Sequence, residues 1–172
     1  LQYRDKTGGP QEVLRAAAVI REVFAGAECR LILNDRADLA TLAGWDGVHV
    51  GQGDLSPEDA RRVVGDGRWV GVSTHTKEEA RLAELSCADY VAVGPVFGTV
   101  TKLDAEAMVG LEGVRRARAL TAKPLVAIGG ITRENARSVM EAGADSVAVI
   151  GALFAEGESC EKVARDFLEI LG

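Results

Sequence analysis

The chain has 172 residues, of which 26 are acidic and 20 are basic, and 47% of them are hydrophobic. This length suits one domain with a sizeable core, and the composition excludes an intrinsically disordered chain. No apolar run approaches the ~18 residues that a transmembrane helix needs. The net charge of −6 argues against a nucleic-acid partner, because phosphate backbones select basic surfaces. The sequence therefore predicts a soluble, cytoplasmic globular protein.

The three cysteines are Cys29, Cys87 and Cys160. They lie far apart, are odd in number and lack the spacing of metal ligands. We expect buried free thiols in a reducing compartment.

Short apolar runs alternate with amphipathic stretches along the chain. Runs such as YVAVGPV and PLVAIGG are typical of strands buried on both faces of a parallel sheet that helices cover. The predicted strands are Leu1–Arg4, Arg30–Asn34, Gly47–Gly51, Trp69–Thr74, Tyr90–Val96, Pro124–Gly130 and Ser146–Gly151.

Helix signals lie between these strands. Ser56 followed by Pro57 is an N-cap with proline at the first helical position, and Thr76 with Glu79 forms a capping box. Gly143 marks the end of another helix.

Alternating strands and helices leave two main architectures, an open doubly wound sheet and a closed (β/α)₈ TIM barrel. No G-x-G-x-x-G follows the first strand, whereas polar and glycine-rich residues follow almost every strand, which favours the barrel. A barrel needs one strand more than the seven predicted. We therefore expect a single α/β barrel domain over residues 1–172 that lacks its first β-strand, with the missing unit preceding residue 1.

The first predicted strand carries Gln2, Arg4 and Lys6 at alternating positions, which point to one side of a strand. Two cations and an amide there could hold an anion such as pyrophosphate. The alternative is an edge strand with solvated charges.

Asp35 and Asp54 follow two consecutive predicted strands. Neighbouring parallel strands would bring the two carboxylates together, and such a pair, sharing a metal with substrate phosphates, is the usual arrangement for Mg²⁺. The alternatives are a helix N-cap for Asp35 and a turn residue for Asp54.

The segment GVSTHT ends a strand with Ser73, whose hydroxyl could contact a substrate or tie down the turn. Nothing near His75 suggests a metal site or a catalytic triad. For His49, within GVHVG, a core role or a role in supporting a site residue is the better interpretation.

Two later loops suit phosphate. After YVAVGPV, a long loop carries Gly98 and, beyond it, hydroxyls and an ammonium group at Thr99, Thr101 and Lys102. The last two strands end in Gly129–Gly130 and Ile150–Gly151, and residues 152–155 could form a short helix at which phosphate is bound; the alternative is tight turns that need glycine.

These segments also carry a family likeness. The order and spacing of LQYRDK, LILNDR, DGVHVGQGDL, GVSTHT, GPVFGTVTK, DAEAMVGLEG and VAIGGI resemble those of thiamine-phosphate synthase, from residue 1 to about Gly151. That resemblance implies a (β/α)₈ barrel that joins 4-amino-2-methyl-5-(diphosphooxymethyl)pyrimidine to a thiazole phosphate. The products are thiamine monophosphate and pyrophosphate, and the enzyme is a cytoplasmic, Mg²⁺-dependent transferase of thiamine biosynthesis.

The resemblance also implies residue roles. Ser73 and Lys102 would be catalytic, Ser73 by contacting the pyrimidine and Lys102 by reaching the departing diphosphate. Asp35 and Asp54 would bind Mg²⁺. The other substrate-binding residues would be Gln2, Tyr3, Arg4, Asp5, Lys6 and Asn34 for the pyrimidine diphosphate, and Thr99, Val100, Thr101, Gly130, Ile150 and Gly151 for the thiazole phosphate.

The implied chemistry is dissociative. Pyrophosphate leaves, a pyrimidine methylene cation forms and the thiazole nitrogen attacks it, so that no protein nucleophile is needed. The chain departs from the family at three points: the family's opening strand has no counterpart, Gly98 replaces Pro or Ala, and Ile150–Gly151 replaces Val-Ser.

Two rival functions remain. A thiazole tautomerase shares the barrel but has a histidine where this chain has Pro95, and it drops parts of the diphosphate site that Arg4, Lys6 and Asp54 retain here. A non-catalytic barrel that binds a phosphorylated ligand is the other rival, which turnover with both substrates would exclude.

Overall fold

The computed structural model describes residues 1–98, 107–154 and 156–172, in which strands and helices alternate. The strands are β1 (Gln2–Tyr3), β2 (Ile32–Asn34), β3 (Gly47–Val50), β4 (Trp69–Thr74), β5 (Tyr90–Val93), β6 (Leu125–Ile128) and β7 (Ser146–Ala148). The helices are α1 (Pro10–Val23), α2 (Ala37–Ala43), α3 (Pro57–Val64), α4 (Lys77–Leu85), α5 (Gly110–Leu120), α6 (Ala136–Glu141) and α7 (Cys160–Leu171), with a 3₁₀ helix η1 (Gly151–Phe154). All seven predicted strands are confirmed, most of them shorter than predicted.

The chain forms two compact units. The first consists of Leu1–Ser73 and Ser86–Asp89, and the second of Thr74–Leu85 and Tyr90–Gly172. In the first unit, β1, β2, β3 and β4 pair in chain order, and each pair is parallel. In the second, β5, β6 and β7 do the same. This parallel order is the α/β architecture that the sequence predicts.

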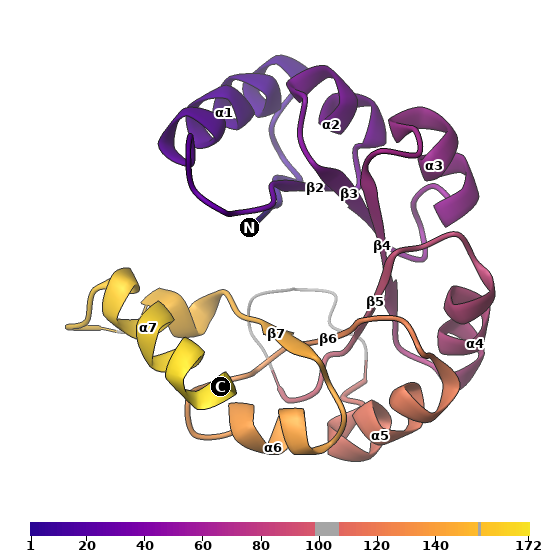
Figure 1. Cartoon of the computed structure of the whole chain (residues 1–172), viewed down its shortest axis with the longest axis vertical. Coiled ribbons are helices and arrows are strands. Elements are labelled where there is room, and N and C mark those ends of the chain that lie inside the picture. Colours follow the sequence, from indigo (N-terminus) through magenta and orange to yellow (C-terminus); the bar gives the residue numbers. More distant parts are fainter. Residues whose placement is uncertain (99–106, 155) are drawn as a thin grey trace. The chain divides into compact units, whose positions relative to one another are not determined.

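In the first unit, helices α1, α2 and α3 lie side by side and cover one face of the strands (Figure 1). The strands bury Leu33, Val48 and Val70 almost completely. Trp45, which is 1% exposed, leads into β3 and donates its indole N–H to the Ala17 carbonyl of α1 at 3.3 Å. The apolar strand runs therefore form a core, as a sheet covered by helices requires.

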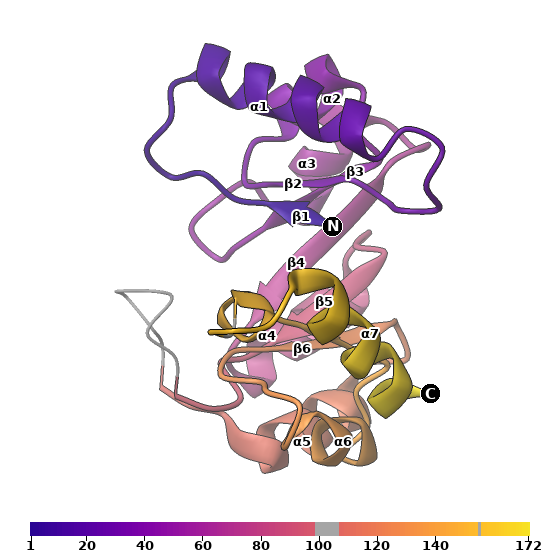
Figure 2. The ribbon, with the colours of Figure 1, turned by 90° about the vertical axis from the view of Figure 1, so that its left-hand side faces the viewer.

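In the second unit, α6 packs against both α5 and α7 (Figure 2). Leu125 and Ala127 of β6 are fully buried, as is Val139 of α6. Helix α7 is tied to the loop before α6 by Arg133, which forms ion pairs with Glu158 and Asp166.

An aspartate directly precedes each of the strands β3, β5 and β7. Each of these aspartates accepts a backbone N–H group at the start of the strand before, which is β2, β4 or β6 respectively. Asp46, Asp89 and Asp145 accept the backbone N–H of Leu31, Val70 and Leu125 at 2.6–2.8 Å. Each of the three also pairs with an arginine: Arg30, Arg61 and Arg118 respectively. We call these three contacts the aspartate clasps.

The helix signals are confirmed. The Ser56 hydroxyl accepts from the Asp59 backbone N–H at 3.1 Å at the start of α3. At α4, Thr76 Oγ1 accepts from the Glu79 N–H at 3.2 Å, and the Glu79 carboxylate accepts from the Thr76 N–H at 3.3 Å. Gly143 adopts a φ of 108° just after α6, a conformation that only glycine reaches easily.

The expectation that the cysteines are buried is wrong, whereas the expectation that they are free thiols is confirmed. Cys87 and Cys160 are exposed and Cys29 is half-buried, and all three are free thiols. Cys160 begins α7 and Cys87 lies in a loop, where spacing in the sequence carries no information about burial.

No helix in the described parts of the chain is long and apolar enough to cross a membrane.

Because one of the aspartate clasps includes Arg61, we expect substitutions of the adjacent α3 residues Arg61 and Arg62 to differ in their effect on stability. Arg61 donates to the carbonyls of Arg68 and Cys87 and to the Asp89 carboxylate, and its side chain is 16% exposed. Arg61→Ala removes the donor that these acceptors share, so we expect unfolding free energy to fall by about 1–3 kcal/mol in urea denaturation.

Arg62→Ala is the matched control. Arg62 pairs only with Asp59 among the described residues, and its side chain is 79% exposed. Its loss should cost no more than about 0.5 kcal/mol. Equal effects of the two substitutions would contradict a structural role for the clasp.

Candidate functional site

The carboxyl ends of β2 and β3 bring two predicted metal ligands together. Asp35 directly follows β2 and Asp54 lies in the loop after β3, and the Asp54 carboxyl lies close enough to raise the pKa of the Asp35 carboxyl. The ammonium group of Lys6, from the segment after β1, forms an ion pair with Asp35. One cation and two carboxylates thus form a cluster at this edge of the first unit.

Asp35 is held in an unusual backbone conformation. Its φ is +64°, and among the described residues it is the one non-glycine residue in the left-handed region. Its N–H donates to the His49 carbonyl at 2.7 Å, which continues the pairing of β2 with β3 by one residue. The N-cap of α2 is Arg36, so the alternative of Asp35 as a helix cap is wrong. A residue held in such a conformation at a strand end is typical of a functional position.

The protonation of Asp35 reflects its surroundings. Burial raises the pKa of the Asp35 carboxyl above its ordinary range, the Lys6 ammonium lowers it, and the Asp54 carboxyl raises it further. The net direction is upward. A carboxyl with this balance gains from a second positive charge, because a cation would favour its ionised form.

Asp54 also closes a turn. Its carboxylate accepts from the Gly51 N–H at 2.8 Å, and its own N–H donates to the Gly51 carbonyl at 3.2 Å. The turn interpretation is therefore correct, and Asp54 still lies near enough to Asp35 to raise its pKa.

The segment after β1 is organised by Asp5. Its carboxylate accepts from the backbone N–H groups of Thr7 and Gly8 at 2.9 and 2.8 Å, and these contacts lower the pKa of Asp5. Tyr3 packs its ring edge-on against Trp45 and donates its hydroxyl to Asp5 at 3.3 Å. Tyr3 and Asp5 thus shape the turn that presents its neighbours.

The predicted binding side chains of this segment remain available. Gln2 and Arg4 are exposed, and Asn34 is half-buried at the end of β2. Strand β1 ends at Tyr3, so alternation along a strand does not extend to Lys6, which turns to Asp35 instead.

Ser73, at the end of β4, is held from two sides. Its hydroxyl lies 2.8 Å from Nε2 of His49, and its carbonyl accepts from the Gln52 amide at 2.6 Å. The interpretation of His49 as a buried residue that supports a site residue agrees with this contact.

In the second unit, the predicted phosphate residues lie at the ends of two paired strands. Ile128 of β6 is in register with Ala148 of β7, so that Gly130 and Ile150 each follow two residues beyond a paired position. Gly130 has a φ of +63°, and a Cβ there would lie 2.5 Å from the Gly98 carbonyl oxygen. Only glycine fits this approach. The predicted short helix is present as η1, which begins at Gly151.

The remaining predicted residues of the phosphate loop, Thr99, Val100, Thr101 and Lys102, lie outside the described residues.

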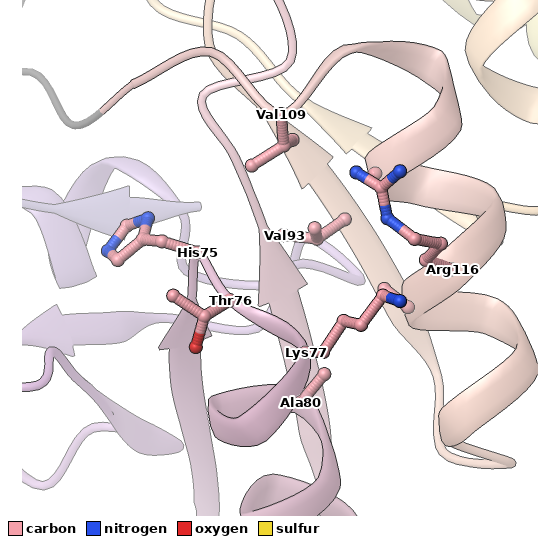
Figure 3. A pocket seen from close by; sticks show the side chains of 9 residues that line it. His75, Thr76, Lys77, Ala80, Val93, Val109 and Arg116 are labelled. Atoms are coloured by element: carbon pink, nitrogen blue, oxygen red, sulfur yellow. The ribbon is translucent and has the colours of Figure 1, made fainter.

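The second unit also has a cavity of about 190 Å³ on the helix-covered side of β5, between α4 and α5 (Figure 3). Lys77 and Arg116 bring two positive charges to it. His75 lines it too and contacts the Gly94 carbonyl through Nδ1 at 2.5 Å. A carbonyl oxygen only accepts hydrogen bonds, so Nδ1 of His75 carries the proton and this contact has a structural role. Among the residues that the structure describes, none of the predicted binding residues lines this cavity, and we do not take it as the candidate site.

Comparison with known proteins decides the family. The model of the thiamine monophosphate synthase family matches residues 1–153. The chain belongs to this family. It is 53% identical to the thiamine-phosphate synthase of Koribacter versatilis over 171 residues, which cover 99% of this chain and 79% of that protein. It is 45% identical to that of Chloroflexus aurantiacus, over 90% of this chain and 71% of that protein.

A solved structure agrees. The thiamine phosphate pyrophosphorylase from Pyrococcus furiosus superposes with a TM-score of 0.87 at 34% identity, over 99% of this chain and 83% of that one. The fold of the chain therefore agrees with its membership of this family.

The residues present fit a magnesium ion. Among the described residues, no group of three or more His, Cys, Asp or Glu side chains is placed to hold a metal. Asp35 and Asp54 nevertheless lie close enough for the Asp54 carboxyl to raise the pKa of Asp35, and Mg²⁺ in phosphate chemistry needs only one or two carboxylates besides water and substrate oxygens.

Sequence reasoning missed Gln52 and the turn-forming role of Asp5. The signal for Gln52 is its place after β3, because a strand end can reach the neighbouring strand. The signal for Asp5 is its spacing from Thr7 and Gly8, which is typical of an Asx turn.

The surroundings of Asp35 predict that replacing its carboxyl group maintains or increases stability but removes metal binding. In Asp35→Asn, asparagine tolerates the left-handed backbone and removes a partly buried charge from beside Asp54. Without metal at pH 7, we expect a melting temperature equal to or above that of the unchanged protein. Mg²⁺ should raise the melting temperature of the unchanged protein and leave that of the variant where it is.

The pH dependence follows from the raised pKa. A raised carboxyl pKa favours the folded state at low pH, and that contribution is lost as the pH rises through the folded value. Any gain in the melting temperature of Asp35→Asn over the unchanged protein should therefore disappear when the pH falls below the ordinary pKa range of a carboxyl group. Asp38→Asn is the control: Asp38 pairs with Arg36, which lowers its pKa, so this variant should keep the response to Mg²⁺. A variant at Asp35 that still responds to Mg²⁺ would exclude Asp35 as a ligand.

A separate prediction concerns Gly130. In Gly130→Ala, a Cβ meets the Gly98 oxygen and Phe97 in a left-handed conformation, so we expect a loss of about 1–2 kcal/mol or more in thermal unfolding. Gly67→Ala, where a Cβ meets nothing within 4 Å, should change stability by less than about 0.5 kcal/mol. Similar losses in both variants would argue against the close approach.

Proposed function

We propose that this protein is a thiamine-phosphate synthase. It would join 4-amino-2-methyl-5-(diphosphooxymethyl)pyrimidine to a thiazole phosphate and release pyrophosphate. The observation that carries the proposal is the cluster of Lys6, Asp35 and Asp54 at the strand ends of a chain from this family. We also propose that the native barrel is the eight-stranded form that the family resemblance implies.

The pyrimidine diphosphate would bind to the first unit. Arg4 and Lys6 supply positive charge for its phosphate oxygens, and Gln2 and Asn34 supply amide groups. Asp35 and Asp54 would hold Mg²⁺, which when bound neutralises charge on the diphosphate and so stabilises it as a leaving group.

The reaction needs charge stabilisation more than proton transfer. The bond between the methylene carbon and the diphosphate oxygen breaks, and its electron pair leaves with pyrophosphate. The lone pair of the thiazole nitrogen then forms the new carbon–nitrogen bond. In this reaction Arg4 and Lys6 stabilise the departing charge, Ser73 contacts the pyrimidine ring, and Lys102 is proposed to act on the leaving group.

The thiazole phosphate would use residues of the second unit. The backbone N–H groups of Gly130, Ile150 and Gly151 suit phosphate oxygens, because amides at strand ends form anion-binding concavities. Thr99, Val100 and Thr101 are proposed to complete this phosphate site.

Lys6 has a second role to play in this scheme. Its ammonium group forms an ion pair with Asp35, and it would also offer positive charge to the diphosphate oxygens. Two carboxylates and a lysine therefore lie at one place in the proposed site for an anionic substrate.

The test is pyrophosphate release by the purified chain. We expect release only when both substrates and Mg²⁺ are present. Asp54→Ala should lower turnover by about 100-fold or more, because the metal contributes several kcal/mol to charge stabilisation.

Asp59→Ala, which removes an exposed aspartate of α3, is the control and should keep full turnover. Near-normal activity of Asp54→Ala would contradict the metal assignment. Binding of both substrates without pyrophosphate release would support the non-catalytic alternative instead.

A further inference from the structure

The ring of His49 contacts Ser73 in the first unit. His49 lies in β3 and is 5% exposed, and its Nε2 is 2.8 Å from Ser73 Oγ. A buried histidine that meets a hydroxyl at a strand end is a candidate for more than core packing, because Ser73 is the residue proposed to contact the pyrimidine.

The strand register explains how the ring reaches Ser73. His49 is paired with Gly71 of β4, and Ser73 lies two residues further along the same face. Gly71 has no side chain, which leaves the imidazole room to lean along the strand. Diagonal neighbours of this kind are within the reach of ring side chains.

His49 and its neighbour Gln52 hold Ser73 at two atoms. The ring of His49 contacts the hydroxyl, and the Gln52 amide donates to the carbonyl at 2.6 Å. The His49 carbonyl in turn accepts from the Asp35 N–H at 2.7 Å. One residue of β3 therefore contacts both the proposed metal ligand and the proposed pyrimidine contact.

We propose that His49 is a positioning residue that fixes the Ser73 hydroxyl for the pyrimidine diphosphate. A free serine hydroxyl rotates among three staggered positions, and the contact with His49 selects one of them. A hydroxyl has one donor and two acceptor positions, so Ser73 keeps capacity for the substrate. Fixing it before binding lowers the entropic cost of the productive complex. This inference rests on the proposed function.

The test compares two substitutions of His49. His49→Leu removes the hydrogen-bonding group, and His49→Gln restores one near the Nε2 position. We expect His49→Leu to lower kcat/KM for the pyrimidine diphosphate about 10- to 100-fold and to leave KM for the thiazole phosphate unchanged. His49→Gln should recover most of the loss. If His49→Leu does not fold, His49→Asn replaces it, since asparagine stays polar but is too short to reach Ser73.

A double-mutant cycle with Ser73→Ala separates positioning from packing. If His49 acts through Ser73, removing the His49 side chain in the Ser73→Ala background should have no further effect on kcat/KM. Equal losses in both backgrounds, or equal rises in KM for both substrates, would overturn the inference. Val48→Ala, on the same strand and fully buried, is the packing control. It should lower the melting temperature and keep kcat/KM.

Calorimetry with the pyrimidine diphosphate alone keeps this inference distinct from the proposed function. An unchanged protein that binds this compound but releases no pyrophosphate would disprove the synthase, and the same cycle in binding affinity would still decide the role of His49. An unchanged protein that does not bind the compound would overturn both.

Discussion

The aspartate clasps are the constraint on which both units depend. Asp46, Asp89 and Asp145 each close the start of a strand and bind an arginine. A buried strand end has backbone groups that need partners, and a charged acceptor is stronger than a neutral one. The clasps hold the strands at their amino ends. The carboxyl ends of the strands can then carry binding residues. In folds of alternating strands and helices, residues at the amino ends usually serve stability and residues at the carboxyl ends usually serve function.

The cluster at the carboxyl ends of the first unit works against stability. Asp35 combines a left-handed backbone, a partly buried carboxyl with a raised pKa and a second carboxyl at Asp54. Lys6 compensates part of this cost. Strain and like charges persist at such a point because the surrounding strands fix it, and a bound cation with a diphosphate would relieve both the repulsion and the desolvation.

An acidic chain can bind an anionic substrate, because its acidic and basic side chains are unevenly distributed over the surface. Exposed pairs such as Arg62 with Asp59 neutralise one another on helix surfaces. Arg4 is exposed, two residues before Lys6 in the chain. The second unit is proposed to bind phosphate mainly through backbone amides, which need no formal charge. The negative net charge of the chain is therefore compatible with an anionic small-molecule substrate.

The sequence by itself determined the strands, the helix caps and the family. These depend on local periodicity, on capping chemistry and on the order of the motifs, all of which are written along the chain. It also placed Asp35 and Asp54 together, because consecutive parallel strands are neighbours. Only the tertiary structure decided that Lys6 turns to Asp35, that Tyr3 packs on Trp45, and that the cysteines are not buried. Those outcomes depend on where strands end and how they register, and a one-residue change of register exchanges the two faces of a strand.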